Sequence, residues 1–328
     1  MLVPQRASVA AAVLLTALGP VHDAAAQVYP SRSITIVVPF AAGGPTDTIA
    51  RILSDRMTAT LGQPLVIENV AGAAGSLGTR RVARSTPDGH TIIVGFLGTH
   101  VLNAAIHNLG YDVEKDFEPI ALLASNPLMI VGKKAIPADD MTNLVTWLKA
   151  RPGKAVQGTP GVGSPAHVAG AYFQRATMTS FQFATYRGAG PAMQDLVGGH
   201  IDLMFDQASN AMSHVRDGTI RAYAVTARQR LASAPEVPTV DEVGLPDFYV
   251  SVWSAMWAPK GTPGAVIAKL NAAVIEALGD DVVRHRLTDL GQEIPPRLQL
   301  TPSALASLQR AEIEKWWPIV RTMHLDTN

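Results

Sequence analysis

The chain has 328 residues, with 27 Lys and Arg against 27 Asp and Glu, and it contains no cysteine. This length suffices for two hydrophobic cores, whereas the lack of cysteine excludes disulfide bonds and thiolate metal sites. The balanced charge, without a dense basic cluster, argues against a nucleic-acid partner. We expect the chain to bind no nucleic acid, metal or cofactor.

The first 26 residues have the pattern of a secretory signal peptide. Arg6 precedes a mostly apolar run over 9–18, and Ala24-Ala25-Ala26 supplies small residues for cleavage before Gln27. The apolar run is shorter than the roughly 18 residues of a membrane-spanning helix. We therefore expect cleavage near Ala26 and export of the mature protein from the cytoplasm.

Apolar strands and amphipathic helices alternate along the rest of the chain. The first series has strands at 34–39, 65–69 and 91–95 and helices at 46–61 and 76–85. Two further strands are expected at 117–123 and 128–132. A second series has helices at 143–150, 165–178, 191–197 and 210–217 and strands near 156, 181–183, 201–205 and 222–225. An extended segment at 250–258 and helices at 263–278, 282–290 and 303–320 complete the chain.

This alternation predicts an α/β fold with mostly parallel strands. Two lobes are favoured over one sheet, because a single doubly wound sheet of so many strands would be unusually wide. Gly and Pro mark the connections near Asn126-Pro127 and 245–248. The predicted division is a first lobe of 27–127 and 252–328 and a second lobe of 128–251.

Three apolar strands run into glycine and then proline, a pattern typical of helix starts. They are Gly43-Gly44-Pro45, Gly163-Ser164-Pro165 and Gly188-Ala189-Gly190-Pro191. Proline suits the first helical position, and glycine permits close approach of a ligand. The free N–H groups and the positive dipole end of such a start attract anions. The pattern indicates a receptor for a small carboxylate held largely by the backbone.

Further motifs run in order through the mature chain. They are Tyr29-Pro30, Phe40 to Asp47, Glu68-Asn69, Gly72 to Gly78, Pro87-Asp88-Gly89, Asp116-Phe117, Gly161 to His167, Tyr186-Arg187-Gly188, Gly198 to Asp202, Val237-Pro238-Thr239, Glu242-Val243-Gly244 and Ala258 to Pro263. Together they are similar to the substrate-binding proteins of tripartite tricarboxylate transporters, the Bug receptors.

The resemblance implies a two-lobed periplasmic-binding-protein fold, of the Venus flytrap, type II-like kind with hinge strands. It also implies a monomer that closes over a small carboxylate and presents it to a membrane permease or a sensor kinase. Members of the family commonly hold the carboxylate with one strand-to-helix loop from each lobe and with ordered water.

In the first lobe, the resemblance places the ligand beside the loop from Phe40 to Asp47. Gly43 and Gly44 would offer backbone N–H groups to the ligand in this loop, which also contains Thr46, and Phe40 forms either a wall of the cleft or part of the core. Asp47 is expected to cap its own helix, because a carboxylate beside an anion site would repel the ligand.

A second glycine-rich helix start in this lobe contains Ala74, Gly75 and Ser76. Thr99 follows the third strand, where ligands of open α/β sheets gather. Its hydroxyl is interpreted either as a ligand contact or as a turn residue.

In the second lobe, Gly163 and Ser164 occupy the matching loop, and Ser164 either caps the helix or donates to the ligand. His167, three residues after Ser164, is a packed or capping residue or a ligand contact.

Tyr186, Arg187 and Gly188 follow the next strand, and Asp206 follows another. Arg187 either grips a carboxylate through two hydrogen bonds or faces solvent. Asp206 is expected to order loop N–H groups rather than to touch an anion.

An enzymatic alternative remains open. Ala74-Gly75-Ser76-Leu77-Gly78 is close to the G-x-S-x-G motif, and Asp206 with His214 or His285 would complete a hydrolase triad in chain order. Residue 74 is not glycine, however, and no HGGG-type segment is present. The alternative function is therefore a secreted serine hydrolase of small esters that uses Ser76. The segment 161–166 matches a dinucleotide-binding motif literally, but Pro165 interrupts it.

Overall fold

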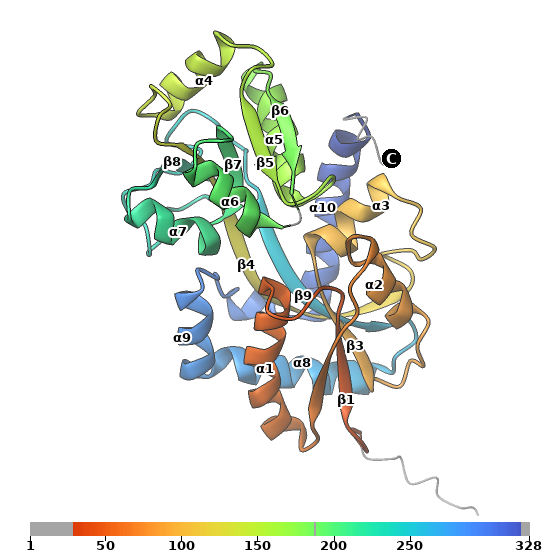
Figure 1. The fold of residues 1–328 in the computed structure, drawn as a ribbon. Coiled ribbons are helices and arrows are strands. Elements are labelled where there is room, and N and C mark those ends of the chain that lie inside the picture. The colour runs from red at the N-terminus through yellow and green to blue at the C-terminus, as the bar shows by residue number, and fades with distance from the viewer. Residues whose placement is uncertain (1–28, 187, 323–328) are drawn as a thin grey trace, which may run out of the picture.

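The computed structural model describes residues 29–186 and 188–322, and two groups of strands share the long strand β4 (Phe117–Lys133) (Figure 1). The strand order is β2-β1-β3-β9-β4-β7-β5-β6, and β8 also pairs with β4. We call the part built on β1, β2, β3 and β9 the first lobe and the part built on β5 to β8 the second lobe. The predicted leader and Arg187 lie outside the described residues.

The first lobe contains the predicted strand–helix alternation. Its strands are β1 (Ile34–Val38), β2 (Leu65–Asn69), β3 (Thr91–Phe96) and β9 (Ser251–Pro259). Its main helices are α1 (Pro45–Leu61), α2 (Ser76–Ala83), α8 (Gly264–Gly279), α9 (Asp281–Asp289) and α10 (Pro302–Thr322). Strands β1, β2 and β3 are parallel, and β9 runs antiparallel to β3.

Helices cover both faces of this sheet, because successive side chains of a strand point to opposite sides. Ile34 and Ile36 of β1 are buried in one core with residues of α1, α8 and α9. Val37 is buried in another core with residues of α2 and α10. The ends of the parallel strands, and the loops that follow them, therefore point toward the second lobe.

The second lobe contains the other α/β series. Its strands are β5 (Val156–Thr159), β6 (Gln182–Thr185), β7 (Leu203–Gln207) and β8 (Ile220–Val225). Its helices are α4 (Met141–Lys149), α5 (Pro165–Thr177), α6 (Ala189–Val197) and α7 (Ala208–Arg216). Strand β5 is parallel to β6 and β7, whereas β7 and β8 are antiparallel to β4.

Strand β4 belongs to both lobes. Residues 117–127 pair with β9, and residues 128–133 pair with β7 and β8. The prediction of two separate strands at 117–123 and 128–132 was therefore wrong. The exchange of partners falls at the predicted lobe boundary after Pro127, and the division of the chain into lobes stays a prediction.

Two other sequence predictions need correction. A short helical segment follows β3, with a π-helical turn at Gly98–Leu102 and helix α3 at Asn103–Ile106, and no helix was predicted there. Helix α6 begins at Ala189, so Gly188 is its N-cap and Pro191 is not its first residue. Among residues 29–186 and 188–322, no helix has the length and apolar character needed to cross a bilayer.

Helix α10 contacts both lobes. Trp317 Nε1 donates to the carbonyl oxygen of Val101 at 3.0 Å in the first lobe. The ring of Trp316 meets the edge of Tyr172 on α5, with centroids 5.8 Å apart, and Lys315 Nζ donates to the carbonyl oxygen of Tyr249. Helix α10 thus packs against both lobes.

Candidate ligand-binding site

The first-lobe loop is held by a buried carboxylate at the start of α1. Asp47 is 1% exposed, and its Oδ2 accepts the N–H of Gly43 at 2.8 Å. Its two oxygens also accept from the guanidinium of Arg51 at 2.8 and 3.0 Å, and Oδ1 accepts from Asn69 Nδ2 at 3.0 Å. These bonds, that from Arg51 first, lower the pKa of Asp47 to about 2. Asp47 therefore fixes the loop before α1, whereas the predicted capping of the helix is not found, because the N-cap Gly44 receives no side-chain hydrogen bond.

The second-lobe loop has the same construction with different side chains. Ser164 is the N-cap of α5, and its Oγ accepts the N–H of His167 at 3.2 Å. The N–H of Gly163 donates to His167 Nδ1 at 3.0 Å. Because Nδ1 accepts this hydrogen bond, the proton of the neutral ring lies on Nε2. Burial of His167, which is 6% exposed, lowers its pKa. Capping by Ser164, the simpler of its two interpretations, is confirmed.

One local arrangement therefore occurs once in each lobe. A glycine at φ +84° or +74° stands two residues before the proline at the first helical position. Its N–H is bound by the side chain four residues later, Asp47 or His167. The expectation that Gly43 offers its N–H to a ligand was therefore wrong. The N–H of Gly44, in contrast, has no partner among the described residues.

His167 makes the second loop sensitive to pH. A proton on Nδ1 would remove the acceptor of the Gly163 N–H, and burial keeps the pKa of His167 below its ordinary value. The stability contributed by the neutral ring is present above pH 6.5 and is lost as the pH falls below it. His167→Asn, whose amide oxygen can accept without titrating, should be less sensitive to acid.

The measurement is chemical denaturation of both proteins at pH 7.5 and pH 5. Burial raises the pKa of Asp206 to about 6, which gives a pH effect of the opposite sign in both proteins. The prediction is therefore tested by the difference between the two proteins in the free energy of unfolding that each loses on acidification. An identical loss of stability on acidification in both would contradict the prediction.

The second glycine-rich start of the first lobe is strained. Ala73 and Ala74 have φ of 47° and 52°, and Gly75 follows at 89°. Two consecutive alanines in the left-handed region are costly, and such strain concentrates at functional sites. The carbonyl oxygen of Ala74 accepts from Asn103 Nδ2 at 2.8 Å. Ser76 is the first residue of α2.

Gly75 brings three predicted site residues together. A Cβ atom at this position would lie 2.8 Å from Phe40 Cζ and 2.7 Å from Thr99 Cγ2. Phe40 is half-buried and meets the ring of Phe96 edge-on at 5.2 Å. Thr99 is fully buried, and its Oγ1 bonds to the backbone N–H and carbonyl of Phe96. The turn interpretation of Thr99 is therefore the one that the structure supports.

Helix α3, which was not predicted, lies between the strained turn at Ala73–Gly75 in the first lobe and the Gly163 loop in the second. Its first residue, Asn103, supports Ala74, and its last residue, Ile106, contacts the second lobe. A Cβ atom on Gly163 would lie 2.5 Å from Ile106 Cδ1. Residue 163 must be small for this approach. Periodicity could not reveal the contact, because it joins residues 57 positions apart.

The remaining predicted residues play supporting parts. Tyr186 donates from its hydroxyl to Asp195 Oδ2 at 2.6 Å, which raises the pKa of Tyr186 to about 12 and directs the hydroxyl to α6. Thr46 is buried in the first turn of α1. Gly188 has open space beside its Cα.

Asp206 is 4% exposed and accepts from the N–H of Gln207 and from Asn210 Nδ2. The carboxylate therefore orders the chain at the start of α7, as predicted.

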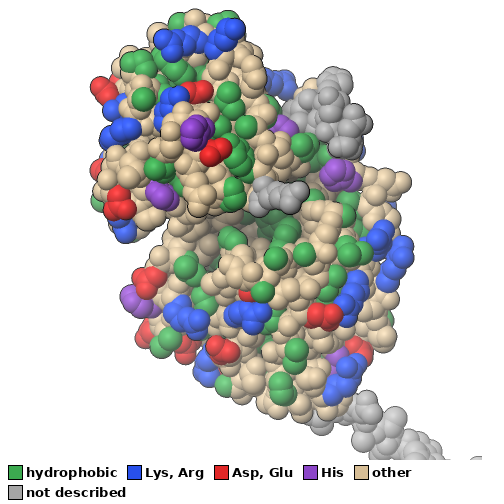
Figure 2. Space-filling model, viewed as in Figure 1, with side chains coloured by type: hydrophobic (Ala, Val, Ile, Leu, Met, Phe, Trp, Pro, Cys, Tyr) green, Lys and Arg blue, Asp and Glu red, His purple; other side chains and the backbone are tan. Residues whose placement is uncertain are grey.

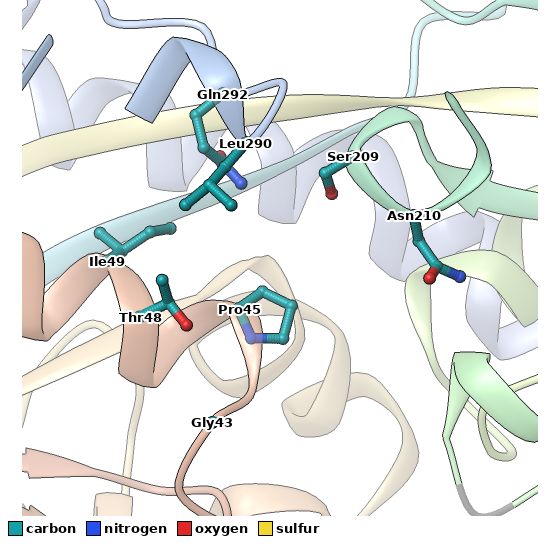
Figure 3. A pocket seen from close by; sticks show the side chains of 8 residues that line it. All are labelled: Gly43, Pro45, Thr48, Ile49, Ser209, Asn210, Leu290 and Gln292. Carbon is teal, nitrogen blue, oxygen red and sulfur yellow. The ribbon is translucent and has the colours of Figure 1, made fainter. Parts of the chain in front are cut away.

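A cavity of about 220 Å³ lies between the starts of α1 and α7. Its lining residues are Gly43, Pro45, Thr48, Ile49, Ser209, Asn210, Leu290 and Gln292. Figure 2 shows the molecule hollowed between the lobes, and Figure 3 shows side chains from both lobes pointing into the cavity. Of the predicted residues only Gly43 lines it. Sequence reasoning missed the others, and only the spacing of Asp206 and Asn210, one helical turn apart, hinted at a contribution from α7.

The hydrolase arrangement is not supported. Within the described part of the chain, Asp206 hydrogen-bonds to neither His214 nor His285, and Ser76 has no histidine partner. No group of three or more metal-ligating side chains is found among these same residues.

The chain forms two α/β lobes that share strand β4, and each lobe has one helix-start loop at the groove between them. This arrangement is typical of a solute-binding protein. The family model described as the tripartite tricarboxylate transporter family receptor matches residues 49–325, and the chain belongs to this family. The receptor fold implied by the sequence motifs is thereby confirmed.

Individual relatives agree with this assignment. Protein BugT of Bordetella pertussis is 33% identical over 311 residues, which cover 94% of each chain. MatC from Rhodopseudomonas palustris, solved with bound malate, is 43% identical with a TM-score of 0.80, covering 89% of this chain and all of its own. Another R. palustris protein, solved with adipate, is 31% identical with a TM-score of 0.81, covering 90% and 98%.

Proposed function

We propose that this receptor captures a small organic carboxylate between its lobes in the periplasm and delivers it to the membrane subunits of a tripartite transporter. Family membership supports the class of function, and the malate and adipate in the similar structures support the class of ligand. A sensor kinase is the alternative recipient of the closed receptor. The observation that carries the proposal is the pair of fixed glycine–proline helix starts, one in each lobe.

The chemistry follows from the cost of removing a carboxylate from water. Each oxygen must keep its hydrogen bonds, and backbone N–H groups and ordered water can provide them without a buried cation. The unpartnered N–H of Gly44 and the positive end of α1 lie on the first lobe. In the second lobe, His167 Nε2–H and the start of α5 lie near the contact between Gly163 and Ile106.

Closure of the lobes would complete this set of donors. The lobes are linked by β4, where it changes partners after Pro127, and by the start of β9. A ligand that contacts both loops binds the closed form more tightly and so shifts the population toward it.

A thermal-shift screen of the secreted protein against mono-, di- and tricarboxylates tests the proposal. A ligand at 100 times its dissociation constant should add about 2.7 kcal/mol of stability. The methyl esters of the same acids are the control, and we expect them to have no effect. Equal stabilisation by acids and esters, or by neither, would contradict carboxylate recognition.

Ser76→Ala separates the receptor from the hydrolase alternative. We expect the variant to bind the stabilising acid as the unaltered protein does, because the proposed site holds the acid through backbone N–H groups rather than through the Ser76 hydroxyl. We also expect neither protein to hydrolyse small esters. Ester turnover that disappears in Ser76→Ala would instead establish a hydrolase.

A further inference from the structure

The cavity between α1 and α7 adjoins the carboxylate-binding loop, since it shares Gly43 and Pro45 with that loop. None of its eight lining residues carries a formal charge, and Ile49 and Leu290 form apolar walls. Its volume of about 220 Å³ equals roughly seven water molecules at about 30 Å³ each. A ligand held at the loop could therefore extend several carbon atoms into it.

Gln292 points into this cavity with an unused amide (Figure 3). Its side chain is 6% exposed and has no hydrogen-bond partner among the described residues. Ser209, on the opposite wall, also has no side-chain partner there. Both polar groups border the cavity, and so they can bond to water or to a bound molecule that enters it.

Two other polar side chains face the cavity mainly as acceptors. Asn210 donates through Nδ2 to Asp206, which leaves its Oδ1 free to accept. The hydroxyl of Thr48 donates to the carbonyl oxygen of Gly44 at 3.1 Å, so the lone pairs of Thr48 Oγ1 are left to accept a hydrogen bond. Asp206 forms no ion pair with the described residues, and its carboxylate stands directly behind Asn210. A second carboxylate at this end could accept from the Gln292 amide and the Ser209 hydroxyl, but it would also face the Asn210 and Thr48 oxygens, with the Asp206 carboxyl group behind Asn210.

We propose that this cavity is the subsite for the far end of the ligand and that it selects a hydrogen-bond donor there, a hydroxyl or an ammonium group, over a second carboxylate. This inference rests on the proposed carboxylate-binding function. Asn210 Oδ1 and Thr48 Oγ1 accept from the donor, and the Gln292 amide completes the bonds of a hydroxyl. The glycine loop keeps the carboxylate at the other end.

The test compares acids of one chain length that differ only at the far end. Hexanoate, 6-hydroxyhexanoate, 6-aminohexanoate and adipate form one set, and butanoate, 4-hydroxybutanoate, 4-aminobutanoate and succinate form a shorter one. Calorimetric titration of the secreted protein should show the hydroxy or amino acid binding at least tenfold more tightly than both the plain acid and the diacid. The hydroxy and amino members distinguish the two kinds of donor.

Variants show whether the cavity is responsible. Gln292→Leu should reduce the preference for the donor-bearing acid over the plain acid at least threefold. Gln299→Leu, the same change at an exposed position, should keep the preference. Asn210→Leu should also reduce the preference for the donor-bearing acid. If this variant does not fold, because Asp206 loses the Asn210 amide, the double variant Asn210→Leu with Asp206→Leu removes the buried acid as well.

Two failures can be told apart. Tightest binding of the diacids, or an unchanged preference in Gln292→Leu, would overturn the inference and leave carboxylate capture intact. A failure of every acid in both sets to bind would overturn the proposed function and the inference with it.

Discussion

Gly163→Ala should weaken carboxylate binding tenfold or more, while the protein stays folded. The new methyl group would lie 2.5 Å from Ile106 Cδ1 of the opposite lobe, so the Ile106 side chain must turn away or the lobes must move apart. The backbone at φ +74° adds strain of about 1 kcal/mol, and tenfold in affinity corresponds to about 1.4 kcal/mol. Calorimetric titration with the acid that most stabilises the unaltered protein measures the loss.

Two variants separate the clash from the strain. Gly161→Ala also forces alanine to a positive φ, +145°, but no atom lies within 4 Å of its new Cβ. It should bind almost normally. Ile106→Ala in the Gly163→Ala background removes the clashing methyl and should recover most of the affinity. Equal losses in the Gly161 and Gly163 variants would show that closure at Ile106 is not needed for binding.

Asp47→Ala should lower the free energy of unfolding by about 2–3 kcal/mol and abolish tight binding. It removes the buried acceptor of the Gly43 N–H, the Asn69 amide and the Arg51 guanidinium. Partly buried donors left unpaired cost about 1–3 kcal/mol, and the glycine loop loses its support. Denaturation by urea at pH 7 and calorimetric titration measure the two effects.

The pH dependence and a partner variant sharpen this result. Because the pKa of Asp47 is lowered to about 2, its contribution is complete above pH 4 and is lost as the pH falls through 2. The stability gap between Asp47→Ala and the unaltered protein should narrow at pH 2. Arg51→Ala should cost less than Asp47→Ala, since the Arg51 side chain is 51% exposed and its charge is screened by solvent. An equal loss of unfolding free energy for both substitutions at pH 7 would contradict the role of Asp47 as the main support of the glycine loop.

The order of elements could be predicted from sequence wherever apolar periodicity was strong. The strand at β1 and the helix at α1 were placed within one or two residues, because alternate and helical spacings are regular there. Strand β4 was divided in two, since Asn126-Pro127 has the composition of a break. In the structure, the proline lies where the strand changes partners, so its missing N–H interrupts no continuous ladder.

The candidate site was predictable at the level of loops but not of contacts. Glycine followed by proline correctly located the starts of α1 and α5. The capture of each glycine N–H by the side chain four residues later was a local signal that went unused. Ile106 and Gln292 could not be found at all, because packing between distant segments brings them to the groove. The ligand contacts of the predicted residues stay predictions.

Helix α10 also constrains how the molecule can open. Its hydrogen bonds to Val101 and Tyr249 and its ring contact with Tyr172 attach it to both lobes on one side of the groove. A rotation that parts the lobes about β4 and β9 must therefore break these contacts or bend the helix. Wide opening of the receptor costs the contacts of α10 in addition to those across the groove.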